Sequence, residues 1–161
     1  MNDRVISCLI FAGALGSGLI AGVFFAFSAF VMSALARLPP PQGIAAMQSI
    51  NVVVINPLFM GVFLGTALLC VALAVMTLMH SSGLRPLIIA GCLLYLVGSL
   101  GVTLAANVPL NNALAGVDSL SAEGAALWQT YLSGWTFWNH MRGIAALAAC
   151  AVFIAAYSAG S

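Results

Sequence analysis

Four long apolar segments constrain this chain more than any other feature of its sequence. They cover approximately residues 5–35, 57–79, 86–107 and 135–158. A helix needs about 20 predominantly apolar residues to cross the hydrocarbon core of a bilayer, and each segment meets that length. Helices joined by short loops are antiparallel neighbours. We therefore predict an all-α integral membrane protein, a single domain over residues 1–161, that forms a four-helix up-down-up-down bundle.

The composition excludes a water-soluble fold. Charged residues make up 4% of the chain and hydrophobic residues 63%, whereas about 25% of the residues in a soluble domain are charged. Such a chain cannot cover itself with a hydrated surface. The net charge is +1 and no basic patch is present to neutralise phosphates, so the sequence argues against nucleic acid as a partner.

Proline and asparagine mark the boundaries of the first two spans. Consecutive prolines at residues 39–41 end the first span, and residues 42–55 are expected to form a short interfacial helix at one end of the bundle. Asn56 followed by Pro57 predicts the N-cap and the first position of the second span. The polar residues 80–85 predict the turn to the third span.

Similar signals divide the second half of the chain. The third span is expected to end or kink near Val108, because the residue before a proline is disfavoured in a helix and Pro109 follows. Ser121 is expected to cap a short helix. Ser133 and Gly134 are expected to break that helix before the fourth span begins at Trp135.

Small residues recur at every fourth position in the first two spans. That spacing places them in one ridge, along which helix backbones can approach closely. Packing within one chain and contact between two copies are both open. The residues are Ala14, Gly18, Gly22 and Ala26 in the first span, and Gly61 and Gly65 in the second.

The predicted topology brings together polar residues that are far apart in the sequence. Both termini and the turn at 80–85 share one end of the bundle. The exit of the first span, the start of the second, the end of the third and the start of the fourth share the other end. The polar residues expected there are Arg37, Gln48, Asn51, Asn56, Asn107, Asn111, Asn112, Trp135, Asn139, His140 and Arg142.

Arg142 is the most informative of these residues because it lies inside a predicted span. An arginine at the centre of a membrane helix costs roughly 2.5–3.5 kcal/mol on insertion scales, so it is expected to face the protein interior. A structural Arg142 would pair with Asp118 or Glu123, or bond carbonyl groups freed near Pro109. A functional Arg142 would stabilise an anion, since its guanidinium stays charged and offers five donors.

The helical period decides which side chains can meet Arg142. At about 100° per residue, Trp135, Asn139 and Arg142 share one narrow face. His140 points about 160° away from Arg142 on the same helix. We therefore expect Asn139 and Arg142 to point inward, and His140 to contact a neighbouring helix or the edge of a pocket.

No motif for a metal or a cofactor is present. The spans contain no carboxylate and no second histidine to accompany His140. The cysteines have no metal-type spacing and are expected to be small buried hydrophobic residues. We predict neither a metal site nor a bound cofactor. The cysteines are Cys8, Cys70, Cys92 and Cys150.

Three motifs occur in order along the chain. They are Asn-Val-Val-Val-Ile-Asn-Pro-Leu-Phe at residues 51–59, Asn-Val-Pro-Leu-Asn at 107–111 and Trp-Thr-Phe-Trp-Asn-His-Met-Arg at 135–142. Together they resemble the anthrone-oxygenase-like family, which consists of small four-span membrane proteins and is catalogued largely as a domain of unknown function. The resemblance covers nearly the whole chain and implies the four-helix fold. The residues that match the family pattern are Asn107, Asn111, Asn139 and Arg142.

The resemblance implies a cofactor-independent monooxygenase that acts on an anthrone-like or other lipophilic aromatic substrate. Such a substrate loses a proton to give a resonance-stabilised carbanion, which reacts with dioxygen directly. His140 is the candidate base, although its direction on the helix speaks against that role. Asn107, Asn139 and Arg142 are the candidate donors to the developing oxyanion.

Four further side chains are expected to bind the substrate. Trp135 and Trp138 can stack on aromatic rings, and Asn51 and Asn111 can offer hydrogen bonds. A structural explanation is equally open for the tryptophans. With two other rings they fit an aromatic belt at the membrane interface, which comprises Trp128, Tyr131, Trp135 and Trp138.

Two other classes of function are open. The small-residue ridges fit a non-enzymatic accessory subunit or a lipophile-binding module of a larger membrane complex. A transporter has less support, because the spans contain no acidic relay. The expected partners are the lipid bilayer, a hydrophobic small molecule, and a second copy or a larger membrane complex.

The expected location is a bacterial inner (plasma) membrane. Arg4 and Arg85 favour the cytoplasm for the end that carries both termini, by the positive-inside rule. Arg37, at the opposite end, argues against this orientation.

Overall fold

The chain is described by a computed structural model that covers residues 3–79 and 83–160. Within these residues the structure contains helices and no strand, which confirms the predicted all-α class. The elements are α1 (Asp3–Ala26), η1 (Phe27–Val31), α2 (Met32–Ala36), α3 (Pro40–Val53), α4 (Pro57–Met79), α5 (Arg85–Leu93), η2 (Leu94–Gly101), η3 (Thr103–Asn107), α6 (Val108–Ala115) and α7 (Ala122–Gly160), where η denotes a π-helical segment.

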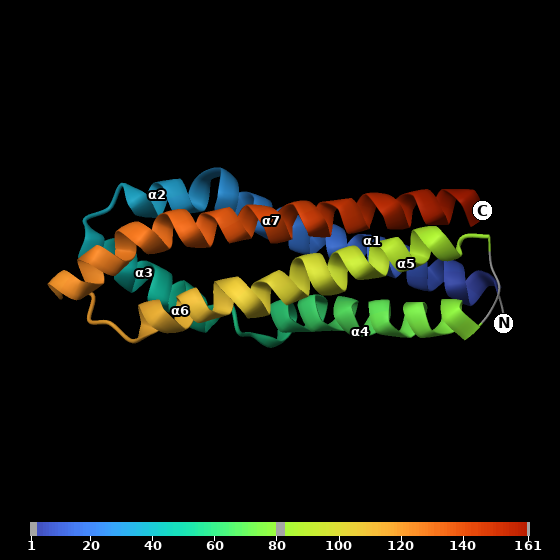
Figure 1. Cartoon of the computed structure of the whole chain (residues 1–161), viewed down its shortest axis with the longest axis horizontal. Helices are drawn as coiled ribbons and strands as arrows, with labels where there is room; N and C mark the ends of the chain where they lie inside the picture. Colours follow the sequence, from blue (N-terminus) through green and yellow to red (C-terminus); the bar gives the residue numbers. More distant parts are fainter. Residues whose placement is uncertain (1–2, 80–82, 161) are drawn as a thin grey trace.

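Several of these elements join into continuous helices that are long and apolar enough to cross a membrane. The described residues contain four such helices, which cover Arg4–Ala36, Pro57–Met79, Arg85–Ala115 and Ala122–Gly160. Both chain termini lie at one end of the molecule, and α2, α3 and α6 lie at the other (Figure 1). His80, Ser81 and Ser82 of the predicted turn lie outside the described residues.

The predicted caps at the starts of two helices are present. The Asn56 side-chain oxygen accepts hydrogen bonds from the backbone amides of Leu58 and Phe59, at 3.1 and 3.0 Å. The Ser121 hydroxyl accepts one from the amide of Gly124 at 2.9 Å. Each side chain therefore satisfies amides that the first turn of a helix leaves without backbone partners.

The third span was predicted to end or kink near Val108, and it does not end there. The helix continues through Pro109 to Ala115, and the reason lies in the π-helical segment η3. There the Val108 amide bonds the carbonyl of Thr103, five residues back. Because the pairing is already shifted by one residue, the missing amide of Pro109 interrupts the helix less than it would in a regular α-helix.

The predicted break at Ser133 and Gly134 was wrong. α7 is continuous across both residues, although an interior glycine costs about 1 kcal/mol relative to alanine. Three buried aromatic residues, Trp128, Tyr131 and Trp135, lie on either side of this dipeptide. A continuous helix places all three on one face, and their packing outweighs the weak local preference.

The core divides into two clusters along the bundle. The cluster nearer the termini, here called the terminal cluster, contains Ile10, Ala14, Ile20, Ala21, Phe24, Phe63, Ala67, Cys70, Leu73, Ile88, Cys92, Tyr95, Ala146, Ala149, Phe153 and Ala156. The distal cluster lies at the other end and contains Met32, Leu35, Ile44, Met47, Leu114, Trp128, Tyr131 and Trp135.

Glycines of the small-residue ridges have two different surroundings. A Cβ added at Gly18 would lie 3.2 Å from the sulfur of Cys150, so this glycine allows α1 and α7 to pack closely. A Cβ added at Gly22, Gly61 or Gly65 would meet nothing within 4 Å. Packing within the chain therefore explains Gly18, and contact with a second copy stays a prediction for the other three.

Candidate functional site

Arg142 is buried in the middle of the bundle, with 7% of its surface exposed. Its Nε and Nη2 atoms donate to the side-chain oxygen of Asn139, at 3.0 and 2.8 Å. Its Nη1 atom donates to the hydroxyl of Thr103 at 3.2 Å. These hydrogen-bond partners are neutral, and no carboxylate in the described part of the chain pairs with the guanidinium.

Two aromatic rings lie close to the guanidinium. Its central carbon lies 4.0 Å from the ring centre of Phe24 and 5.0 Å from that of Trp135. Both distances are within the range of a cation–π interaction, which gains strength when the cation is removed from water. The rings stabilise the positive charge partly but do not neutralise it.

Asn139 fixes the position of Arg142 by joining α7 to α1. Its side-chain nitrogen donates to the carbonyl of Phe24 and to the hydroxyl of Ser28, both at 2.7 Å. With both donors used, its oxygen remains to receive the guanidinium. The acceptors lie beside the π-helical turn η1, where the amide of Met32 bonds the carbonyl of Phe27, five residues back. Such turns are frequent at functional sites.

Polar residues at every fourth position of the third span face α7. The Asn111 side-chain oxygen accepts hydrogen bonds from Trp135 Nε1 and from the Tyr131 hydroxyl, both at 2.8 Å. The Asn107 side-chain nitrogen donates to the backbone carbonyl of Trp135 at 3.2 Å. Thr103 holds Arg142 one turn further along. The step from Thr103 to Asn107 lies in the π-helical segment η3, and the step from Asn107 to Asn111 lies in α6.

A cavity of about 220 Å³ lies against this network. Its walls come from α1, η1, α3, α4, the third span and α7. Most lining side chains are apolar. The lining residues with polar side-chain atoms are Asn51, Thr103, Asn111, Trp135 and Arg142.

Asn51 gives the cavity a hydrogen-bond donor without a partner. Its side-chain nitrogen is buried and lies beside the Tyr131 hydroxyl, with no hydrogen-bond partner within 3.5 Å among the described residues. A buried donor left without a partner costs roughly 1–3 kcal/mol. A ligand acceptor in the cavity would remove this cost.

The structure brings together six of the eight predicted site residues. Four line the cavity. Asn107 and Asn139 are not part of the lining, but each forms a hydrogen bond to a lining residue, Trp135 and Arg142 respectively. Ser28, Phe24 and Thr103 also contact this network but were missed by the sequence analysis. Only Thr103 carried a signal, since it lies four and eight residues before two predicted asparagines. The four lining residues are Asn51, Asn111, Trp135 and Arg142.

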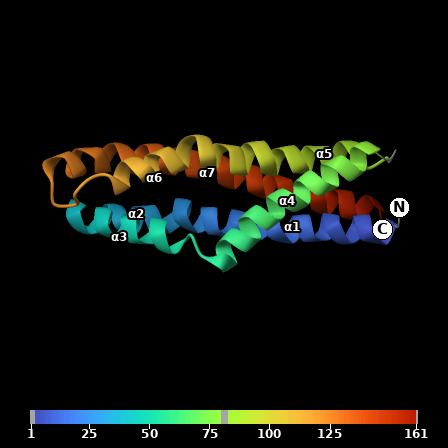
Figure 2. The ribbon, with the colours of Figure 1, turned by 90° about the horizontal axis from the view of Figure 1, so that it is seen from below.

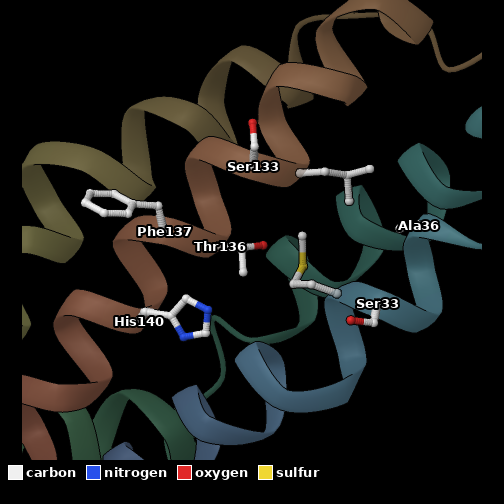
Figure 3. Close-up of a pocket in the computed structure, with 8 residues that line it drawn as sticks. Ser33, Ala36, Ser133, Thr136, Phe137 and His140 are labelled. Atoms are coloured by element: carbon white, nitrogen blue, oxygen red, sulfur yellow. The ribbon is translucent and has the colours of Figure 1, made fainter.

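His140 and Trp138 do not lie with the other predicted residues. His140 is exposed on another face of α7 and lines two grooves. The larger groove, of about 460 Å³, lies between α2 and α7, and Figure 3 shows His140 and Thr136 extending from α7 toward Ser33 on α2. Trp138 is 39% exposed and is stacked edge-on against Phe137. The helical direction predicted for His140 agrees with this placement.

These contacts correct two structural interpretations of the sequence, one of Arg142 and one of the aromatic residues. Arg142 pairs with neither Asp118 nor Glu123. The predicted aromatic belt is largely internal, since Trp128, Tyr131 and Trp135 are buried and stacked on one another. Of the four rings, only that of Trp138 faces outward.

The side chains of the site are hydrogen-bond donors rather than metal ligands. Among residues 3–79 and 83–160, no group of three or more His, Cys, Asp or Glu side chains comes together. Described cysteines are free, and Cys70 and Cys92 belong to the terminal cluster. The cavity can therefore hold an apolar body and donate hydrogen bonds to an acceptor or an anion.

Comparison with known protein families gives one finding. The family model described as anthrone oxygenase matches residues 59–152, which is more than half of the 161 residues. The matched region contains Thr103, Asn107, Asn111, Asn139 and Arg142. Searches of curated proteins and of solved structures found no match.

Proposed function

The chain belongs to the anthrone oxygenase family, and on this premise we propose that it is a membrane oxygenase of an anthrone-like, lipophilic aromatic substrate. One observation carries the proposal. A buried guanidinium whose hydrogen-bond partners are neutral borders an apolar cavity. Removal of a charge from water is expensive unless the charge is paired, so the cavity beside Arg142 suits the conjugate base of the substrate.

The donors available to that anion can be counted. A guanidinium offers five N–H groups, and Arg142 uses three of them within the described chain. Two N–H groups remain, and the unpartnered Asn51 nitrogen adds a further donor. Donors fixed in place before the reaction stabilise a developing oxyanion without reorganisation, which is the arrangement of an oxyanion hole.

The proposed reaction balances without an added reductant. A ring methylene next to the conjugated system loses a proton to water, and the negative charge moves to the carbonyl oxygen beside Arg142. The carbanion forms a C–O bond with dioxygen to give a peroxide. The outer peroxide oxygen takes up the first proton from water. Transfer of the second methylene proton, through water, to the same oxygen then breaks the O–O bond. One oxygen atom becomes a carbonyl of the product, and the other leaves as water.

The cavity walls suit both reactants. Phe24, Phe27, Phe59 and Phe63 line the cavity and provide faces for an aromatic ring. Dioxygen is apolar and dissolves better among such side chains than in water. The expected role of Trp135 is to support the ring of the substrate and to cover the guanidinium.

A second candidate function is binding of the same class of molecule without chemistry. It is supported by the cavity lining, which contains no His, Asp, Glu, Cys or Lys that could accept a proton. His140, the base expected from the sequence, lines other grooves. Under this second function the protein would be a lipophile-binding module or an accessory subunit of a membrane complex.

Oxygen consumption by the purified protein in lipid nanodiscs distinguishes the two functions. With anthrone or emodin anthrone, an oxygenase consumes dioxygen faster than protein-free nanodiscs and forms the quinone. Arg142→Met should lower this rate by about 100-fold or more, since loss of one oxyanion donor costs that much in known enzymes. The matched control is Arg37→Met, which removes an exposed arginine. Binding of the substrate without any oxygen uptake would favour the second function.

We further propose that the protein works in a bacterial plasma membrane with both termini in the cytoplasm. Arg4 lies in the first turn of α1 and Arg85 begins α5, whereas Arg37 directly follows α2. The first two positions belong to the end that carries the termini, and the third to the other end. Two arginines against one favour this orientation. Contact with a second copy or with a larger complex is proposed through the outward glycines of α4.

A further inference from the structure

The exposed part of the cavity lining is entirely aliphatic. Of the lining residues, only Ile55, Leu64 and Leu104 are exposed, to 71%, 42% and 60%. The lining residues with polar side-chain atoms are buried or half-buried. A binding site that opens to water normally has polar groups around its mouth. Here the polarity is reversed, with hydrogen-bond donors inside and hydrocarbon outside.

Two of the three exposed lining residues lie in membrane-spanning helices, and Ile55 lies in the connection between α3 and α4. Leu64 belongs to α4 and Leu104 to the third span. Leu64 lies seven residues after the start of α4, or about 10 Å along the helix axis. α4 also crosses the bundle obliquely, and its first turns lie farther from α6 than its last turns lie from α5 (Figure 2). The mouth is therefore on the side of the bundle.

We propose that the cavity opens sideways into the hydrocarbon of the bilayer, between α4 and η3, and takes its ligand from the membrane. The ligand is a membrane-dissolved aromatic compound with one acidic oxygen, a description that rests on the proposed function. It enters with the oxygen first, toward Arg142 and Asn51, while its apolar edge remains at the mouth. An alkyl tail on that edge stays in the lipid.

The size of the cavity supports this arrangement. About 220 Å³ is below the roughly 300–1,000 Å³ of typical small-molecule pockets. It can enclose the ring system of a small aromatic compound but not a long chain as well. A closed site of this size would exclude tailed ligands, and a water-facing site would leave the tail exposed to water, whereas a lipid-facing site accepts the tail.

Cysteine labelling tests the mouth without reference to activity. The protein in nanodiscs is treated with a charged trimethylammonium methanethiosulfonate, and modified sites are identified by mass spectrometry. A thiol reacts as its thiolate, which does not form in hydrocarbon, so Leu104→Cys should react about tenfold or more slowly than Glu123→Cys. The matched lipid-facing control is Leu68→Cys, at an α4 position that is 71% exposed and does not line the cavity. Reaction of Leu104→Cys as fast as Glu123→Cys would overturn the proposal.

Ligand entry provides the second test. Association of 2-naphthol and of an octyl-substituted 2-naphthol is followed in nanodiscs by energy transfer from tryptophan. We expect similar dissociation constants for the two ligands at equal membrane concentration. Leu104→Phe should slow association of both by about fivefold and change the dissociation constant little, because a narrowed route alters rates. Leu68→Phe should change neither quantity. Unchanged association in Leu104→Phe, or exclusion of the tailed ligand, would contradict a lateral entrance.

The two proposals can fail separately. Absence of oxygen uptake, with slow labelling of Leu104→Cys and binding of the tailed naphthol, would remove the oxygenase and leave the lateral entrance. Fast labelling of Leu104→Cys by the charged reagent would remove the entrance and leave the oxygenase untouched.

Discussion

The two ends of α7 bury residues at the same spacing but differ in the size and polarity of those residues. Toward the C-terminus, α7 buries mostly small residues, and Gly13 and Gly91 leave room for the single large ring of Phe153. Toward its start it buries Trp128, Tyr131 and Trp135, followed by two polar residues. The first arrangement closes the bundle. The second packs large rings and hydrogen-bonded side chains between the helices, and the cavity lies beside Trp135 and Arg142.

This difference shows how one helix can both stabilise a membrane bundle and form a site. Close backbone packing is the principal attraction between helices in lipid, so the C-terminal half of α7 supplies stability without any charge. The region around Arg142 loses part of that packing and gains donors in fixed positions. Variants in the two regions should therefore affect different measurements.

Asn139→Leu should have the largest effect, because it removes the side chain that holds Arg142 in place. The variant loses the bonds to Phe24 and Ser28 and leaves the guanidinium without its main acceptor. Loss of one partner of a buried charge costs about 3–5 kcal/mol. We expect a strongly lowered unfolding midpoint and no measurable oxygen uptake. Asn112→Leu, at an exposed position of α6, is the control. A stable and active Asn139→Leu protein would show that Arg142 does not depend on this clamp.

Gly91→Val should disturb the close packing around Phe153 and leave the cavity unchanged. A Cβ at this position would lie 2.7 Å from the ring of Phe153, and overpacking of this kind costs about 1–3 kcal/mol. The unfolding midpoint in detergent should fall, while the affinity for 2-naphthol should stay unchanged. Leu93→Val, at a position of α5 that is 54% exposed, should leave the unfolding midpoint as it is. A loss of naphthol affinity in Gly91→Val would mean that the two regions are coupled.

Much of this architecture follows from the sequence, because it depends on local chemistry. The four spans follow from segment length and hydropathy, and the caps at Asn56 and Ser121 from the preferences of single residues. The helical period alone separates His140 from the face that carries Asn139 and Arg142. These features need no knowledge of how the helices pack.

The rest depends on contacts between helices and could not be predicted. No composition signals a π-helical turn, so the continuation of the helix through Pro109 was unforeseen. The continuity of α7 at Gly134 results from the packing of distant rings. Thr103 and Phe24 join the site because of the register between helices, and a sequence without coordinates does not fix that register.

Asn51→Ala should have smaller effects, and they should differ in sign between the stability of the free protein and its affinity for the ligand. In the free protein it removes a buried donor that has no partner, so stability should stay equal or rise by about 1 kcal/mol. In the complex it removes a hydrogen bond to the ligand oxygen, and affinity for 2-naphthol should fall by about fivefold to tenfold. Thermal unfolding with and without ligand measures both effects. A loss of stability in the free protein would indicate that Asn51 has a structural partner.

His140→Asn should have the smallest effect of all, and it tests which face of α7 is the functional one. The side chain is exposed and lines grooves outside the cavity. If the donors around Arg142 act without a protein base, the rate of oxygen uptake should change by less than about twofold, whereas loss of a general base costs about 100-fold or more. The pH dependence of the rate should likewise be the same in both proteins. A large loss of rate in His140→Asn, with normal naphthol affinity, would move the chemistry to the groove between α2 and α7 and leave the cavity as a binding site.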